Sequence, residues 1–258
     1  MYFFVFKQKT AYESEYGLVG SEMCIRDRDD AMETIFIWYG HAAFGLTIGD
    51  DRILIDPFLT GNPAATVKAA ELDADYILIT HGHGDHIGDT LPIAMRTKAL
   101  CISNFEICSW LSAKGVDTHA QHIGGGHSFP FGHLKLTPAL HGSALPDGSY
   151  GGNPVGFLLT TPDGKKIYIA GDTGLFGDMQ LIGDEGIDLA ALPIGDNYTM
   201  GPEDALKAVK LLRPRRVVPV HYNTWDLIAQ DLRAWKTRVE AETEAEVVIL
   251  KPGESLVL

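Results

Sequence analysis

The sequence predicts an α+β protein, with two β-sheets packed together and helices on the outside, in a single domain. Three observations favour this class. Short β-type runs, punctuated by Gly, Pro and Asp, recur through the chain, and helical patterns lie between them. After residue 31 no low-complexity linker, repeat or change of composition divides the chain. The same pattern also fits an open doubly wound sheet, and periodicity alone does not separate the two.

The first half of the body is expected to be mainly β. Residues 34–40 read as a strand, and residues 44–58 as two strands joined by a tight "GDD" turn. Residues 73–80, "DADYILIT", form a continuous apolar run, typical of a strand buried on both faces. Residues 87–99 have helical spacing, and a further strand and helix are expected at 99–104 and 105–115.

The second half alternates strands and helices more regularly. The stretch 133–141 alternates like a strand, and 155–172 predicts a hairpin with a Pro-Asp-Gly turn. Residues 201–213 predict a helix, because Pro and acidic residues open it and basic residues close it. Further expected elements are strands at 187–195 and 215–223, a helix at 225–242, and β structure at 245–258.

The first 31 residues differ from the rest of the chain. Segments such as "KQKTAYE" and "GLVGSEMCIRDR" resemble translated sequencing-adapter DNA joined in frame to a gene. We therefore expect 1–31 to be a non-native, disordered or irregular extension, and 32–258 to be the folded, functional domain. The opening "MYFFVF" has no basic region before it and no small-residue cleavage pattern after it, so it does not read as a signal peptide.

Composition narrows the class of protein. The chain of 258 residues has a formal net charge of -13, which disfavours binding to nucleic acids and anionic membranes. No apolar run reaches the roughly 18 residues that a membrane span needs. Of the three cysteines, Cys24 lies in the first segment, and Cys101 and Cys108 fit apolar packing. We expect a cytoplasmic protein that acts without nucleic acid or membrane, and self-association stays open.

Four predicted strands end in a residue of the type that binds metals. These residues are His81, His141, Asp172 and His221. If the strands run the same way in facing sheets, all four side chains converge on one edge. Between strand and helix, "HGHGDH" adds further ligand-type residues, and burying them without a metal would be costly.

Spacing within that loop predicts two groups of ligands. His81 and His83 are two residues apart, so in extended backbone they point the same way. Asp85 and His86 enter the following helix and face another direction. An aspartate shared between two ions about 3.5–4 Å apart would bridge them, and Asp172 is the best candidate.

For the other candidate residues, a purely structural role is an alternative to a functional one. Asp56, in "LIDPFLTGNP", either supports a site loop or caps a turn. His41, in "YGHAAF", is either a proton donor to the reaction or a structural histidine. Four histidines lie in polar or glycine-rich stretches and are expected to be solvated: His119, His122, His127 and His133.

The motif "THGHGDH" resembles the signature H-x-H-x-D-H of the metallo-β-lactamase superfamily. The likeness continues through "GHAAF", "TPALHGS", "AGDTGLFGDM", "LPIGDNYTMGPEDA" and "VVPVHYN", and it covers essentially 32–258. Together these motifs resemble uncharacterised metal-dependent hydrolases close to the L-ascorbate-6-phosphate lactonase-like branch. The resemblance implies an αββα sandwich with its metal site on one rim.

The resemblance also implies a set of ligands. His81, His83 and His141 would bind one ion, Asp85, His86 and His221 a second, and Asp172 would bridge them. The ions would be divalent, Zn²⁺ first, with Mn²⁺ or Fe²⁺ also possible. A hydroxide between them would attack a small ester, lactone or phosphodiester, with Asp85 and Asp172 orienting it and His41 assisting. Because Asp172 stands where some true β-lactamases have cysteine, the resemblance does not extend to antibiotic hydrolysis.

Two other functions fit the same ligands. An iron-dependent oxidoreductase, such as a persulfide dioxygenase, uses a similar set, since metal choice also depends on availability and geometry. A metal-binding protein without turnover is the other alternative. Elemental analysis, oxygen consumption and a substrate panel would separate the three.

Overall fold

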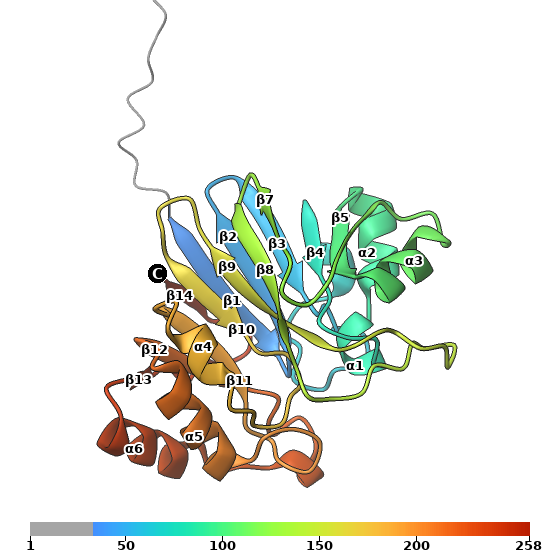
Figure 1. Ribbon diagram of the computed structural model, residues 1–258. Helices are drawn as coiled ribbons and strands as arrows, with labels where there is room; N and C mark the ends of the chain where they lie inside the picture. The colour runs from blue at the N-terminus through green and yellow to red at the C-terminus, as the bar shows by residue number, and fades with distance from the viewer. Residues whose placement is uncertain (1–32) are drawn as a thin grey trace, which may run out of the picture. The chain divides into compact units, whose positions relative to one another are not determined.

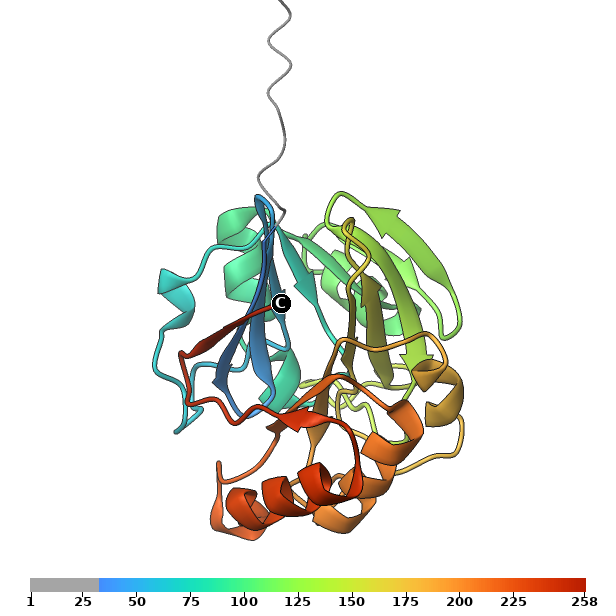
Figure 2. The ribbon, with the colours of Figure 1, turned by 90° about the vertical axis from the view of Figure 1, so that its left-hand side faces the viewer.

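Two mixed sheets of seven strands each face one another in the computed structural model, which describes residues 33–258 (Figures 1 and 2). The first sheet contains, in spatial order, β14 (Ser255–Val257), β1 (Thr34–Gly40), β2 (Ala43–Ile48), β3 (Asp51–Ile55), β4 (Tyr76–Leu78), β5 (Leu100–Asn104) and β6 (Thr118–Gln121). The second contains β13 (Glu246–Val247), β12 (Arg216–Val220), β11 (Leu189–Pro193), β10 (Lys166–Ile169), β9 (Val155–Thr160), β8 (Gly132–Pro138) and β7 (Gly126–Phe129). The two-sheet prediction is confirmed, and the open single sheet is wrong.

Strand direction decides where the loops meet. In the first sheet β3 and β4 are parallel, and two antiparallel steps through β2 make β1 run with them. In the second sheet β10, β11 and β12 are parallel, and two antiparallel steps through β9 make β8 run with them. The carboxyl ends of all strands in each of these sets therefore lie at one end of their sheet.

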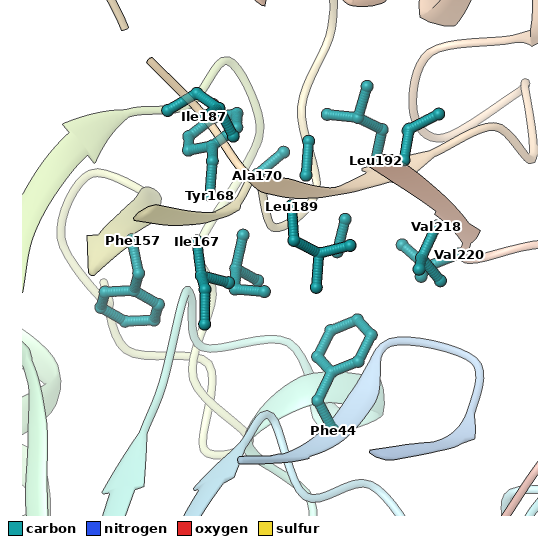
Figure 3. Close-up of a cluster of buried hydrophobic side chains, with 14 of the residues drawn as sticks. Phe44, Phe157, Ile167, Tyr168, Ala170, Ile187, Leu189, Leu192, Val218 and Val220 are labelled. Atoms are coloured by element: carbon teal, nitrogen blue, oxygen red, sulfur yellow. The ribbon is translucent and has the colours of Figure 1, made fainter. Parts of the chain in front are cut away.

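The core between the sheets follows from alternation along the strands. Ile53 and Ile55 of β3 face the second sheet, whereas Leu54 between them packs on the opposite face. Figure 3 shows Phe44 of β2 pointing across the gap towards Ile167 and Leu189 of the second sheet. Each fully buried side chain of this kind stabilises the fold by about 1.5–3 kcal/mol.

Helices cover the outer face of each sheet (Figure 1). α2 (Thr90–Thr97) and α3 (Phe105–Ser112) pack on the first sheet through buried residues such as Ile93 and Leu111. α4 (Met179–Gly183), α5 (Pro202–Leu212) and α6 (Leu232–Glu242) cover the second. The arrangement is the single-domain αββα sandwich of the metallo-β-lactamase fold.

The structure splits two of the expected helices. The helical pattern at 87–99 becomes α1 (Gly84–Ile87) and α2, separated at Gly88, where a Cβ would lie 2.7 Å from the Cα of Phe58. The pattern at 225–242 becomes a 3₁₀ turn at Asp226–Ile228 and then α6, whose N-cap Asp231 accepts bonds from two backbone amides. A second 3₁₀ turn, Ala69–Glu71, and the elements β6, β7 and α4 were not predicted.

The first segment, with Cys24, lies outside the described residues, so its non-native origin stays a prediction. Across residues 33–258, no helix combines the length and the apolar character that crossing a bilayer would require.

Candidate metal centre

The predicted site residues gather at the ends of the two sheets that the strand directions bring together. His41 follows β1, Asp56 follows β3 and His81 lies three residues after β4. From the second sheet, His141 and Asp172 each lie three residues beyond their strands, β8 and β10. His221 directly follows β12, and the remaining ligand-type residues, His83, Asp85 and His86, lie at the start of α1.

The first expected group of ligands does assemble. One ring nitrogen from each of His81, His83 and His141 lies within 4.8 Å of the others. His81 Nε2 and His83 Nδ1 are 3.0 Å apart, so both face the same point. His81 is buried, and His83 and His141 are partly exposed, which leaves this side of the site open to solvent.

The second group contains one more residue than the resemblance implied. Side-chain donor atoms of Asp85, His86 and His221 lie within 4.8 Å of one another, and His41 lies within the same limit. Asp85 and His86 enter the site from the short helix α1, as expected from their place after Gly84. The backbone of His221 is fixed, because its amide nitrogen donates to the carbonyl oxygen of His41 at 3.0 Å.

Asp172 lies between the two groups. Its Oδ2 is 3.5 Å from Nε2 of His141 in the first group, and 3.3 and 3.0 Å from Nε2 of His86 and His221 in the second. The side chain is almost completely buried. One carboxylate oxygen therefore contacts ligand atoms on both sides, which is the geometry that a bridging ligand requires.

The donor atoms fit divalent metal ions. Within residues 33–258, the buried atoms without a hydrogen-bond partner include His86 Nε2, both ring nitrogens of His221 and Asp172 Oδ1. Leaving such atoms unpaired is costly, and an ion among them removes the cost. Tetrahedral metal–nitrogen bonds of 2.0–2.1 Å place neighbouring donors about 3.3–3.4 Å apart, close to the separations around Asp172 Oδ2.

Asp56 holds ligands of both groups. Its Oδ2 lies 2.8 Å from His86 Nδ1, so the ring donates there and turns Nε2 towards the site. Its two oxygens also accept from the amide and hydroxyl of Thr80, at 2.8 and 2.5 Å. Because the Thr80 hydroxyl hydrogen is committed to Asp56, Thr80 Oγ1 accepts from His81 Nδ1 at 3.0 Å. Asp56 thus supports the site loop, the first of its two sequence interpretations.

His41 is fully buried behind Asp85. Its Nε2 lies 3.2 Å from Asp85 Oδ2 and its Nδ1 lies 2.8 Å from Thr224 Oγ1. An ionised carboxylate has no hydrogen to give, so Nε2 of His41 donates to Asp85 and Nδ1 accepts from Thr224. The structure therefore brings His41 to the site through Asp85.

Burial and neighbouring charges set the protonation of the site. Burial lowers the pKa of His81 and His141, and it lowers that of His41 to about 4 despite the bond to Asp85, so these rings are neutral. Burial also opposes the charge on His86, but Asp172 and Asp56 outweigh it and raise its pKa well above the usual value. Since a ligating imidazole must be neutral, metal uptake is expected to release a proton from His86.

Both aspartates of the site stay ionised. Burial alone would raise the pKa of Asp172, but His86 and His221 hold it well below the usual range. Burial likewise opposes the charge on Asp85, yet the hydrogen bond from His41 and the nearby His86 keep its pKa low. Negative oxygens are thus available to divalent ions at neutral pH.

Sequence reasoning missed Thr80 and Thr224, which orient His81 and His41. Each stands close to a predicted ligand, in "THGHGDH" and "HYNTW", and that closeness was the available signal. The histidines expected to be solvated lie elsewhere, on β6, β7, β8 and the loop between β6 and β7, and only His119 of the four is not largely exposed.

Gly171 offers a test of how tightly the loop of Asp172 is held. Its φ is +63°, and a Cβ would lie 2.9 Å from Thr80 Cβ and 3.1 Å from the carbonyl oxygen of Val155. Gly171→Ala should lower the free energy of unfolding by about 2–3 kcal/mol, from backbone strain plus overpacking. Urea denaturation measures this loss.

The control for that variant is Gly148→Ala. Gly148 also has a positive φ, +82°, but nothing lies within 4 Å of the added Cβ. It should lose only the strain, about 1 kcal/mol. Equal losses in both variants would show that contact with Thr80 does not constrain the loop.

Comparisons with known proteins agree with this geometry. The family model described as "Beta-lactamase superfamily domain" matches residues 51–222. A UPF0173 metal-dependent hydrolase of Pelotomaculum thermopropionicum is 55% identical over 224 residues, which are 85% of this chain and 97% of that protein. One from Thermus thermophilus is 51% identical over 219 residues, or 85% and 96%.

A solved structure is similar over almost its whole length. Igni18, described as a novel metallo hydrolase from the archaeon Ignicoccus hospitalis, is 39% identical, with a TM-score of 0.80 over 88% of this chain and 98% of that one. The fold, the converging histidines and aspartates, and these relatives lead to one conclusion. The chain belongs to the UPF0173 family of metal-dependent hydrolases, in the metallo-β-lactamase superfamily.

Proposed function

We propose that this hydrolase is dinuclear and acts on a small ester, lactone or phosphodiester. The observation that carries the proposal is the position of Asp172 Oδ2, within 3.5 Å of ligand nitrogens from both groups. His81, His83 and His141 would hold one ion, and Asp85, His86 and His221 the other. Zn²⁺ suits this mixture of imidazole and carboxylate ligands, and Mn²⁺ or Fe²⁺ can replace it.

Two ions in these positions would lower the pKa of a water between them towards 7 and so supply a nucleophile at neutral pH. Carboxylates of the protein would orient this water for attack. Asp172 and Asp85 face the point where the two groups meet, and their low pKa values leave oxygen lone pairs free to accept a hydrogen bond there. The partly exposed His83 and His141 border the approach that a substrate would take.

His41 is proposed to position Asp85 rather than to contact the substrate. The ring is completely buried, and Nε2 donates to the carboxylate while Thr224 fixes the other nitrogen. A neutral ring in this place keeps Asp85 in one orientation without adding charge. Proton donation by His41 to a leaving group, the other expectation, would need the ring to reach beyond Asp85.

The number of ligands favours a dinuclear site over the site of a mononuclear iron oxygenase. A mononuclear iron oxygenase typically offers three protein ligands and leaves several positions open. Here six proposed ligands converge around Asp172, which is the seventh, and seven are enough for two ions. The lactonase-like resemblance supports lactones within the substrate class, although the relatives described above are not named for any substrate.

A cytoplasmic location and a small-molecule substrate complete the proposal. Cys101 and Cys108 are buried free thiols, and burial raises the pKa of each to about 12. They are therefore unreactive packing residues, which is compatible with a reducing compartment.

The test combines elemental analysis with a panel of lactones, thioesters and phosphodiesters. We expect two ions per chain and hydrolysis of at least one substrate class, both lost in His81→Ala. His127→Ala, at an exposed histidine on β7, should change neither. One iron per chain with oxygen consumption on a persulfide, or hydrolysis that persists in His81→Ala after chelation, would contradict the proposal.

A further inference from the structure

Large apolar side chains are exposed around the metal centre. They belong to loops that follow the carboxyl ends of β3, β8, β11 and β12, the same loops that hold or border the ligands. We call these residues the apolar rim: Phe58, Leu140, Tyr198, Trp225 and Leu227. Four of them are more than 40% exposed, although exposing such side chains to water is unfavourable.

One side of the rim lies directly over the second ligand group. The ring of Trp225 is 4.9 Å from that of His41, edge to face, and Phe58 lies 5.9 Å from the same histidine. Trp225 and Phe58 are themselves 6.4 Å apart. Leu227, 60% exposed, follows in the 3₁₀ turn at Asp226–Ile228. Both rings therefore pack on the histidine that donates to Asp85, and Trp225 stays 42% exposed.

The other side of the rim is tied to the loop of Asp172. Leu140 donates its amide to Thr173 Oγ1 and accepts from the amide of Gly174, while its side chain is 57% exposed. The loop that carries Tyr198 is held by a bond from the amide of Met200 to the carbonyl oxygen of Thr173. The backbones of both loops are therefore anchored to Thr173, the residue that follows the proposed bridging ligand.

Basic side chains are nearly absent from these loops. The loops in question, all within the described residues, are 41–42, 56–75, 79–89, 139–154, 170–178, 194–201 and 221–231. Their single Lys or Arg is Lys68, which lines a hollow over α2 with Pro92 and Ile93, on the outer face of the first sheet. Lys and Arg side chains are the usual partners of a phosphate or carboxylate that is bound away from the ions.

Exposed acidic residues instead occupy the same loops. Asp147, Asp178, Asp196 and Asp226 are all exposed. Their field repels an anionic group that approaches the site, in addition to the excess of acidic residues in the whole chain.

We propose that the apolar rim selects substrates that carry an uncharged alkyl or aryl group next to the bond that is cleaved, and that it disfavours substrates with a phosphate or carboxylate at that end. The inference rests on the proposed function, because it names the substrate class of the same site. The acidic residues of these loops would also attract a cation, so the comparison of a cationic with a neutral substrate of equal length is part of the test.

The first test is a series of γ-lactones whose side chain grows from methyl to propyl to pentyl. A fully buried methylene favours binding by about fourfold, so a half-buried chain should raise kcat/KM about twofold per methylene, or more than tenfold over the series. A lactone ending in a phosphate or a trimethylammonium group should react at least tenfold more slowly than a neutral one of equal length.

Substitutions assign the selectivity to the rim. Trp225→Ala and Leu227→Ala should each reduce the gain over the series to threefold or less, with unchanged metal content. Leu227→Lys should narrow the difference in kcat/KM between the phosphorylated and the neutral lactone. Leu181→Ala is the matched control, because Leu181 is 66% exposed on α4, outside the rim, and should leave the slope unchanged.

A binding experiment separates this inference from the proposed function. Calorimetry of the metal-loaded protein with acetohydroxamic, butanohydroxamic and hexanohydroxamic acids should show an affinity that rises with chain length. In Trp225→Ala the affinity should not depend on chain length. Rising affinity without hydrolysis of any lactone, ester or phosphodiester would support the rim and refute the proposed function. Hydrolysis with no dependence on chain length, or a preference for either charged lactone, would refute the rim and leave the proposed function intact.

Discussion

Replacing Asp172 with alanine is expected to reduce kcat/KM by about 10³-fold or more and to lower the metal content from two ions per chain to one or none. The carboxylate contacts ligand nitrogens of both groups, so in the proposed dinuclear site its loss would remove one donor from each ion and a negative charge between them. Steady-state kinetics on a reactive substrate, with elemental analysis of the same sample, measures both effects.

The matched control is Asp178→Ala, six residues further along the same loop. Asp178 is exposed and contacts none of the ligand residues through a described hydrogen bond or ion pair. Its replacement should leave turnover and metal content unchanged. Asp172→Asn should resemble Asp172→Ala in metal content, because an amide cannot supply the missing charge. Retention of two ions in both Asp172 variants would exclude the bridge.

Replacing Asp56 with alanine is expected to lower the free energy of unfolding by about 3–5 kcal/mol and to weaken metal binding about 10–100-fold. Three buried donors lose their acceptor at once: the amide and hydroxyl of Thr80 and the Nδ1–H of His86. Breaking a buried charged pair typically costs that much energy, and removing a residue that orients metal ligands costs that much affinity. Urea denaturation and competition with a metal chelator measure the two quantities.

Two further variants separate the contributions of Asp56. Its φ is 46°, a conformation that asparagine tolerates better than alanine, so Asp56→Asn removes the charge with less backbone strain. We expect the loss of unfolding free energy in Asp56→Asn to be about half of the loss in Asp56→Ala. The loss of metal affinity should be nearly the same in both variants. Asp184→Ala breaks an exposed pair with Arg213 and should cost less than about 1 kcal/mol. Normal metal affinity in Asp56→Asn would show that His86 is oriented by other contacts.

The position of the site could be predicted from the sequence because it depends on strand ends. His81, Asp172 and His221 each follow an apolar run, and parallel strands bring such residues to one edge. The two groups followed from the spacing of the histidines in "HGHGDH" and from the start of a helix after Gly84. These signals are local, so one sequence is sufficient to read them.

The residues that orient the ligands depend on contacts that no local pattern encodes. Asp56 reaches His86 and Thr80 only because β3 and β4 lie side by side as parallel neighbours. His41 reaches Thr224 across 183 positions of the chain. Hydrophobic periodicity likewise missed β7, whose short, mostly exposed sequence "GHSF" carries no alternation of apolar and polar residues. Tertiary contact, rather than propensity, determines each of these features.

The central claim is that Asp172 bridges two ions. Anomalous X-ray diffraction from crystals of the metal-loaded protein, recorded at the absorption edge of the bound metal, tests it most directly. We expect two peaks about 3.5–4 Å apart, with Asp172 Oδ2 between them. One peak should be surrounded by His81, His83 and His141, and the other by Asp85, His86 and His221. A single peak per chain, or two peaks of which only one lies within bonding distance of Asp172, would contradict it.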